Sequence, residues 1–160
     1  SRSGLVTVTG GKWTTYRAMA EDVLEQCFDK SLLKRRSAGV TTHLKLIGAG
    51  RTGDLQESIS HPPGLHSYGS EQVQVLQMPG AHLELAPGLT EAMVRFAVRF
   101  EYARCVEDVL ARRSRLLFLD AKLARTIGPK VAEIVWQETG LDPQTEAFSA
   151  LAEEYLRLPT

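Results

Sequence analysis

The sequence predicts a mostly α-helical protein in which a strand, a glycine turn and a helix precede a C-terminal bundle of helices. First, apolar residues recur at three- and four-residue spacing over most of the chain after residue 66. Second, a short β-branched run near the start leads directly into two glycines. Third, 160 residues with 43% apolar and 24% charged side chains have the composition of a globular chain that can bury a core.

The first unit reads as a strand over residues 5–8, ended by Gly10 and Gly11, and a helix that begins at Thr14. Such a turn leaves backbone N–H groups and the positive end of the helix dipole facing outward, and Lys12 adds a charge. The turn can therefore hold an anion, although an ordinary strand-to-helix connection is the alternative. The apolar side of this helix comprises Tyr16, Met19, Ala20, Val23, Leu24, Cys27 and Phe28.

Residues 29–65 have the composition of a linker, with a basic run at 34–36, one possible strand at 40–47, and a proline pair at 62–63. The segment also holds a literal G-x-G-x-x-G at residues 48–53. A dinucleotide site needs a helix directly after such a motif and then a second parallel strand. Neither follows here, so we do not expect that site.

Helical periodicity fills residues 66–160. The pattern predicts helices over residues 70–78, 90–111 and 120–139, with Gly140 ending the third and Gly128-Pro129 dividing it into two pieces. Asp142 and Pro143 are expected to cap and open a final helix that runs to residue 156.

Two faces are distinguishable on the predicted helix over residues 90–111. Glu101, Arg104, Asp108 and Arg112 alternate in sign and predict a solvated ladder of ion pairs, or a face turned to a partner domain. Arg112, Arg113 and Arg115 are also candidate phosphate contacts. The apolar stripe comprises Met93, Phe96, Ala97, Phe100, Ala103, Val106 and Leu110.

Charge and composition limit the chemistry. Nineteen basic residues balance nineteen acidic ones, so no overall field attracts nucleic acid or an anionic membrane. Cys27 and Cys105 form neither a disulfide framework nor a zinc motif. His43, His61, His66 and His82 lie in or near predicted loops and have no partners at the spacing of a triad or metal set. We therefore predict no metal site and no catalytic side chain.

GGKWTTYR at residues 10–17, followed by AVRFEYARCVEDVLARRSRLLFLD at residues 97–120, resembles the C-terminal part of the FAD-dependent glycerol-3-phosphate dehydrogenases. The resemblance implies that residues 1–28 are the C-terminal edge of an FAD-binding α/β domain, residues 29–65 a linker, and residues 66–160 a helical C-terminal domain. The residues that match the family's flavin-contacting turn are Gly10, Gly11, Lys12, Trp13 and Thr14. Lys12 also matches a position near the substrate phosphate.

The same resemblance implies a function for the parent enzyme. It would oxidise sn-glycerol 3-phosphate to dihydroxyacetone phosphate, pass electrons through FAD to a quinone, and lie in the cytoplasm, peripheral at the cytoplasmic face of the membrane. The bundle's partners would be the FAD and substrate domains of the parent chain, and a homodimer is a further possibility. Trp13 departs from the family, which often has Leu there, and the lack of a cysteine-rich iron–sulfur region favours the aerobic type.

The abrupt SRSG start predicts an excised piece of that enzyme, which we expect to be inactive alone and not to bind FAD tightly. Its first strand, with no sheet to join, would be mobile or would recruit residues 40–47 or a second molecule. The alternative function is a helical nucleic-acid-binding or regulatory module, since residues 121–140 loosely resemble a helix-turn-helix. Pro129 and the balanced charge oppose it, so no nucleic-acid partner is expected.

Overall fold

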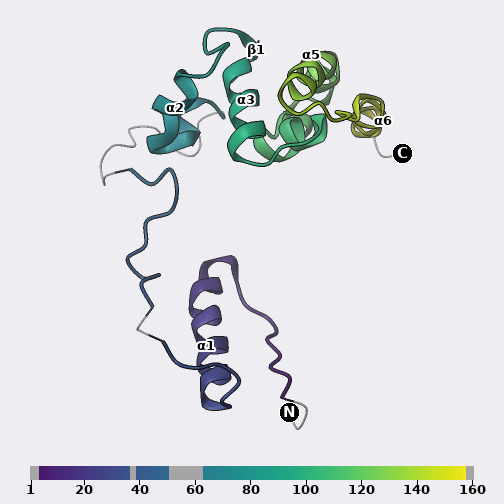
Figure 1. Cartoon of the computed structure of the whole chain (residues 1–160). Coiled ribbons are helices and arrows are strands. Elements are labelled where there is room, and N and C mark those ends of the chain that lie inside the picture. The colour runs from purple at the N-terminus through teal and green to yellow at the C-terminus, as the bar shows by residue number, and fades with distance from the viewer. Residues whose placement is uncertain (1–3, 37–38, 51–62, 158–160) are drawn as a thin grey trace. The chain divides into compact units, whose positions relative to one another are not determined.

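The computed structural model describes residues 4–36, 39–50 and 63–157 and divides the chain into two compact units, Ser1–Leu46 and Ile47–Thr160 (Figure 1). Helices dominate the described residues, and their two short strands form a single hairpin. The predicted fold class, mostly α with a C-terminal helical bundle, is confirmed. The unit boundary falls inside the segment predicted as a linker, while the three-part domain division stays a prediction.

The first unit contains the helix that periodicity predicts. A 3-10 turn, η1 (Trp13–Thr15), leads into α1 (Tyr16–Asp29). The predicted strand over residues 5–8 is wrong, because residues 4–12 belong to no strand. The possible strand at 40–47 is wrong too: residues 41–43 form a turn, in which the N–H of His43 donates to the carbonyl of Val40 at 3.0 Å. A β-branched run forms a ladder only beside another extended segment, and none pairs with it among the described residues of this unit.

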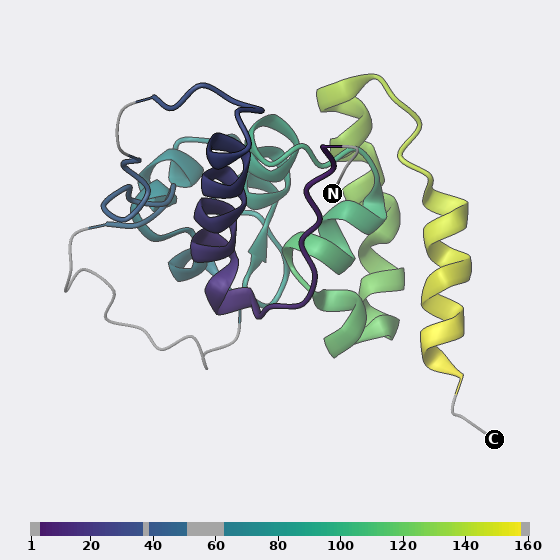
Figure 2. The ribbon, with the colours of Figure 1, turned by 90° about the horizontal axis from the view of Figure 1, so that it is seen from below.

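The predicted apolar side of α1 is only partly covered. Met19, Val23, Cys27 and Phe28 are half-buried, and no residue of α1 is fully buried. The extended segment before the helix lies along it, with Gly11 close to Met19 (Figures 1 and 2). The described residues of this unit therefore form no closed apolar core.

The second unit holds the bundle. Its elements are η2 (Leu65–Glu71), α2 (Gln72–Leu76), β1 (Glu84–Ala86), β2 (Leu89–Thr90), α3 (Glu91–Phe100), the π-helical turn η3 (Asp108–Arg113), α4 (Leu116–Leu119), α5 (Ala121–Thr139) and α6 (Thr145–Leu156). Helix α5 packs against α3, and α6 runs back along α5 (Figure 2). The largest fully buried side chains among the described residues of this unit are Phe96, Leu110, Leu117 and Ile134. The predicted apolar stripe is buried with one exception, Phe100, which is 54% exposed.

The predicted helix over residues 90–111 is broken. Helix α3 ends at Phe100, and Tyr102 then adopts a left-handed conformation with φ of +58°. The carboxylate of Asp108 accepts hydrogen bonds from the N–H groups of Arg104 at 2.8 Å and Cys105 at 3.3 Å. These bonds satisfy the donors of a new helix start, so the chain turns and winds again as η3.

The expected division of the next helix at Gly128-Pro129 is wrong as well. Helix α5 continues through Pro129, because the residues after it, among them Val131 and Ile134, are buried and outweigh the one hydrogen bond lost. Gly140 ends the helix as predicted, with φ of +67°. Without a turn at Gly128, the resemblance of residues 121–140 to a helix-turn-helix has no structural counterpart.

Helix α6 begins later than predicted. Asp142 accepts a hydrogen bond from the N–H of Gln144 at 2.9 Å, and Gln144, with φ of +57°, is the residue before Thr145. Asp142 therefore closes a turn ahead of the helix instead of capping it. The β1–β2 hairpin was not predicted. It turns through Pro87 and Gly88, whose φ is +74°.

Candidate functional site

The turn at residues 10–14 joins the extended segment to η1 and α1. Gly10 and Gly11 have φ of +76° and +109°, a region that side chains with a Cβ rarely adopt. A Cβ on Gly11 would also lie 2.2 Å from the sulfur of Met19. Both glycines are therefore required for this entry into the helix.

Polar groups of the turn are partly satisfied by Thr15. Its Oγ1 accepts from the N–H of Lys12 at 3.0 Å, and its own N–H donates to the Lys12 carbonyl at 2.9 Å. Among the described residues, the N–H groups of Trp13 and Thr14 have no acceptor. They lie at the positive end of the helix, beside the exposed side chains of Lys12 and Trp13. Such a turn can bind an anion or an electron-rich ring edge.

The predicted ladder of ion pairs forms only in part. Arg112 pairs with Asp108 at 3.0 Å, as the spacing predicts. Arg104 instead donates to the carbonyls of Val98 and Ala103 at 3.1 and 3.0 Å and lies over the ring of Tyr102. The helix break turns Arg104 back toward the end of α3, so the ladder prediction is wrong at that step.

Burial and hydrogen bonding perturb three groups around this break. Burial raises the pKa of the Asp108 carboxyl, but the N–H groups of Arg104 and Cys105 outweigh it, so this pKa lies below its usual range. Burial also raises the pKa of the Cys105 thiol. A protonated, half-buried thiol is a poor nucleophile. Burial raises the pKa of the Glu101 carboxyl as well.

A cleft of about 810 Å³ lies in the second unit. It brings together η2, the hairpin and the segment that follows η3, which are distant in sequence. Its polar side chains include His66, Tyr68, Glu71, Glu101, Arg113 and Arg115. Burial raises the pKa of the Tyr68 hydroxyl, so Tyr68 stays protonated. Sequence reasoning named the arginines but missed the cleft, because no local pattern links residues 64–71 to residues 112–115.

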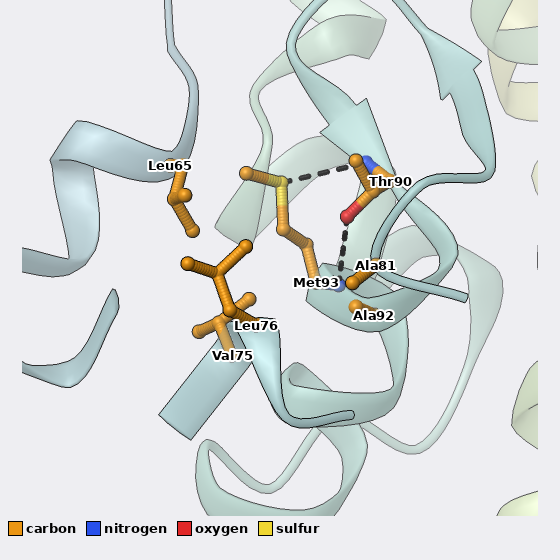
Figure 3. A pocket seen from close by; sticks show the side chains of 7 residues that line it. All are labelled: Leu65, Val75, Leu76, Ala81, Thr90, Ala92 and Met93. Carbon is orange, nitrogen blue, oxygen red and sulfur yellow. Dashed lines mark hydrogen bonds between the residues drawn. The ribbon is translucent and has the colours of Figure 1, made fainter. Parts of the chain in front are cut away.

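A second, much smaller cavity of about 30 Å³ lies beside the start of α3 (Figure 3). Leu65, Val75, Leu76 and Met93 point into it, and Thr90 accepts a hydrogen bond from the N–H of Met93 at 3.3 Å (Figure 3). This volume is about that of one water, and the walls are mainly apolar. It is a packing gap and not a ligand site.

Other candidate groups do not assemble. No cluster that could hold a metal ion occurs among the described residues. His43 lies in the first unit and His66 and His82 in the second, while His61 falls outside the described residues, as do residues 51–53 of the G-x-G-x-x-G segment. In the described part of the chain, no helix is both long and apolar enough to span a bilayer.

Comparison with known proteins gives a consistent result. A family model described as the C-terminal domain of alpha-glycerophosphate oxidase matches residues 39–146. A probable mitochondrial glycerol-3-phosphate dehydrogenase of Dictyostelium discoideum is 35% identical over 84% of this chain and 24% of its own length. The mitochondrial glycerol-3-phosphate dehydrogenase SDP6 of Arabidopsis thaliana is 34% identical over 84% of this chain and 26% of its own length.

The mitochondrial glycerol-3-phosphate dehydrogenase of Homo sapiens is 29% identical over 89% of this chain and 22% of its own length. The chain thus spans about a quarter of the length of these curated relatives. No solved structure matches it.

Proposed function

Because the chain belongs to the family of the C-terminal domain of alpha-glycerophosphate oxidase, we propose that it is the C-terminal part of an FAD-dependent enzyme that oxidises sn-glycerol 3-phosphate to dihydroxyacetone phosphate. The observation that carries the proposal is the similarity to relatives named glycerol-3-phosphate dehydrogenase along 84% or more of this chain. The partners of residues 1–160 are then the FAD and substrate domains of the same polypeptide.

The residues of the turn at 10–14 fit a contact with FAD, since the N–H groups of Trp13 and Thr14 have no acceptor among the described residues and both residues are exposed. FAD, when bound, supplies the acceptor for the hydride that leaves C2 of the substrate. The two N–H groups and the positive end of α1 stabilise negative charge placed next to them. Lys12 provides an ammonium group for the substrate phosphate.

The route of the electrons and the location follow from the same proposal. Electrons pass from FAD to a membrane quinone, and the enzyme lies at the membrane surface, on the cytoplasmic face. The named relatives are mitochondrial proteins. A homodimer of the parent enzyme is part of the proposal, with no surface assigned to it.

The proposal is tested in a polypeptide that joins residues 1–160 to the FAD-binding part of the enzyme. Lys12→Ala should lower kcat/KM for glycerol 3-phosphate by roughly ten- to several-hundred-fold, because a charge-assisted contact contributes about 1.5–3 kcal/mol. Lys30→Ala, which removes an exposed lysine at the other end of α1, is the matched control and should leave kcat/KM unchanged. Equal kinetics for Lys12→Ala and wild type would exclude Lys12 from the site.

A second measurement uses residues 1–160 alone. This chain should be colourless after purification with added FAD, and it should not reduce a dye with glycerol 3-phosphate, because the turn offers only one edge of a flavin site. A yellow, active preparation would show that the described chain holds a complete site.

A further inference from the structure

Three arginines border the large cleft of the second unit, and their partners differ. Arg112 forms ion pairs with Glu107 and with Asp108, the latter at 3.0 Å. Arg113 lies 3.5 Å from Asp108 and donates to the carbonyl of Glu101. Arg115 lines the same cleft, and no residue described in the structure pairs with its guanidinium.

The backbone of Arg115 adopts a left-handed conformation, as do Tyr102 and Gln144 in the same unit. Its φ of +59° and ψ of +14° place it in the left-handed region, which costs free energy for any residue with a Cβ. Glycine or asparagine would fill the position with less strain. Arg115 places a long cation there, and no residue that the structure describes pairs with it. Strain of this kind is typical of sites where a side chain serves a ligand.

The π-helical turn η3 ends at Arg113, and Arg112, Arg113 and Arg115 all line the cleft. A π-helix turns less per residue than an α-helix, and such turns are frequent at functional sites. Residues 112–115 follow one another along the cleft wall. Together the lining carries three arginines and two carboxylates, Glu71 and Glu101. Glu107 and Asp108 pair with Arg112 and Arg113, so Arg115 is the lining arginine that has no ion-pair partner among the described residues.

The remaining walls carry further polar side chains and an apolar surface. His66 and Ser67, in the first turn of η2, contribute polar side chains. Leu89, Met93 and Pro63 contribute apolar area. A volume of about 810 Å³ lies within the range of small-molecule sites, which combine apolar walls with a few convergent polar groups.

We propose that this cleft binds a small phosphate monoester with an apolar or aromatic body, whose phosphate contacts the guanidinium of Arg115. Arg112, which is half exposed, lies on the same wall and is already paired with Glu107 and Asp108, so Arg115 carries the phosphate contact. The body of the ligand lies against Leu89 and Met93. The turn at residues 10–14 takes no part, so this proposal does not depend on the proposed function.

The experiment titrates the 160-residue chain with phenyl phosphate and follows backbone amide shifts by NMR. Saturable binding is expected, with shifts gathered at residues 63–71, 88–93 and 112–115. Inorganic phosphate should bind more weakly because it lacks the apolar body. Benzyl alcohol should not bind at the same concentrations because it lacks the charge.

Variants of Arg115 separate binding from folding. Arg115→Gly removes the cation and relieves the backbone strain, so the variant should fold at least as well as wild type while binding at least about tenfold more weakly. Arg115→Lys keeps the charge and should retain part of the affinity. Lys122→Gln removes an exposed cation of α5 that does not line the cleft, and its affinity should equal that of wild type.

Three outcomes would overturn the proposal. Phenyl phosphate fails to saturate the chain at millimolar concentrations, or Arg115→Gly binds as tightly as wild type, or Lys122→Gln weakens binding as much as Arg115→Gly. The last result would show a general charge effect and no specific site.

Discussion

The guanidinium of Arg99 on α3 donates two hydrogen bonds, of 2.6 and 2.8 Å, to the carboxylate of Glu138 at the end of α5. Arg95, one turn earlier on α3, donates to the same carboxylate at 2.5 Å. A carboxylate at a helix C-terminus is opposed by the helix dipole, so it needs cations beside it. Two arginines supply them and join α3 to α5 across about forty residues of sequence.

Glu138→Gln should destabilise the second unit by about 2 kcal/mol. The side chain of Glu138 is 9% exposed and that of Arg95 13%, so the substitution leaves a nearly buried guanidinium without its full counter-charge. Urea unfolding followed by circular dichroism measures the change. The matched control is Glu133→Gln in the same helix, whose exposed pair with Lys130 should contribute nothing measurable. Equal losses for both variants would contradict the assignment.

Stability should fall in acid partly through Glu138. The hydrogen bond from Arg99, opposed by burial and aided by Arg95, holds the pKa of this carboxyl below its usual range. The stabilisation is therefore complete above the unfolded-state pKa of about 4.3 and is lost as the pH falls through the folded-state pKa.

The measurement is the difference in unfolding free energy between wild type and Glu138→Gln from neutral pH to about pH 3. This difference should shrink as the pH falls. The contribution of Glu101 to the pH dependence of stability is the same in both proteins, so it cancels in this difference. Burial raises the pKa of Glu101, so its contribution has the opposite sign to that of Glu138. A difference that stays constant over this range would show that Glu138 does not titrate as proposed.

Thr90 should contribute about 1 kcal/mol as the N-cap of α3. Its hydroxyl oxygen accepts from the N–H of Met93 at 3.3 Å, and Thr90→Ala leaves that partly buried donor without an acceptor. Thr90→Ser keeps the hydroxyl and should restore most of the loss. Thermal unfolding of the three proteins provides the comparison. A serine variant as unstable as the alanine variant would mean that the threonine methyl group, and not the cap, stabilises α3.

Gly140→Ala should cost about 1 kcal/mol through the backbone alone. The φ of +67° is unfavourable for alanine, while no atom lies within 4 Å of the position that its Cβ would take. Gly140→Asn should cost less, because asparagine tolerates this conformation. Urea unfolding of both variants decides the matter, and equal losses would point to a cause other than backbone conformation.

Periodicity and caps predict the fold where a segment's structure depends on its own residues. The helix after Thr14, the end of α5 at Gly140 and the buried stripe of α3 follow from spacing and turn chemistry. The break after Phe100 does not. It depends on Asp108 capping Arg104 and on Arg113 reaching the carbonyl of Glu101, contacts that give no periodic signal.

The predicted strand over residues 5–8 is wrong for a related reason, because a strand needs a neighbouring strand that the local sequence does not supply. At the candidate sites, the sequence alone names the glycine turn and the arginines. The cleft around Arg115 requires η2, the hairpin and η3 to meet, and the left-handed conformation of Arg115 gives no signal in the sequence. Those relationships are tertiary, and no window of the sequence contains them.

The N–H of Val106 donates to the carbonyl of Pro143 at 3.0 Å, a bond across the loop that leads into α6. Nearby, Gly128 packs against Phe148. A Cβ on Gly128 would lie 3.4 Å from the ring of Phe148, so a larger side chain would press on that ring. The amide proton of Val106 is thus shielded from solvent by a segment 37 residues further along the chain. The rate at which this amide exchanges with deuterium therefore reports how often α6 and the loop before it detach from the rest of the unit. Neighbouring amides report their own local openings, so the two kinds of motion can be measured separately.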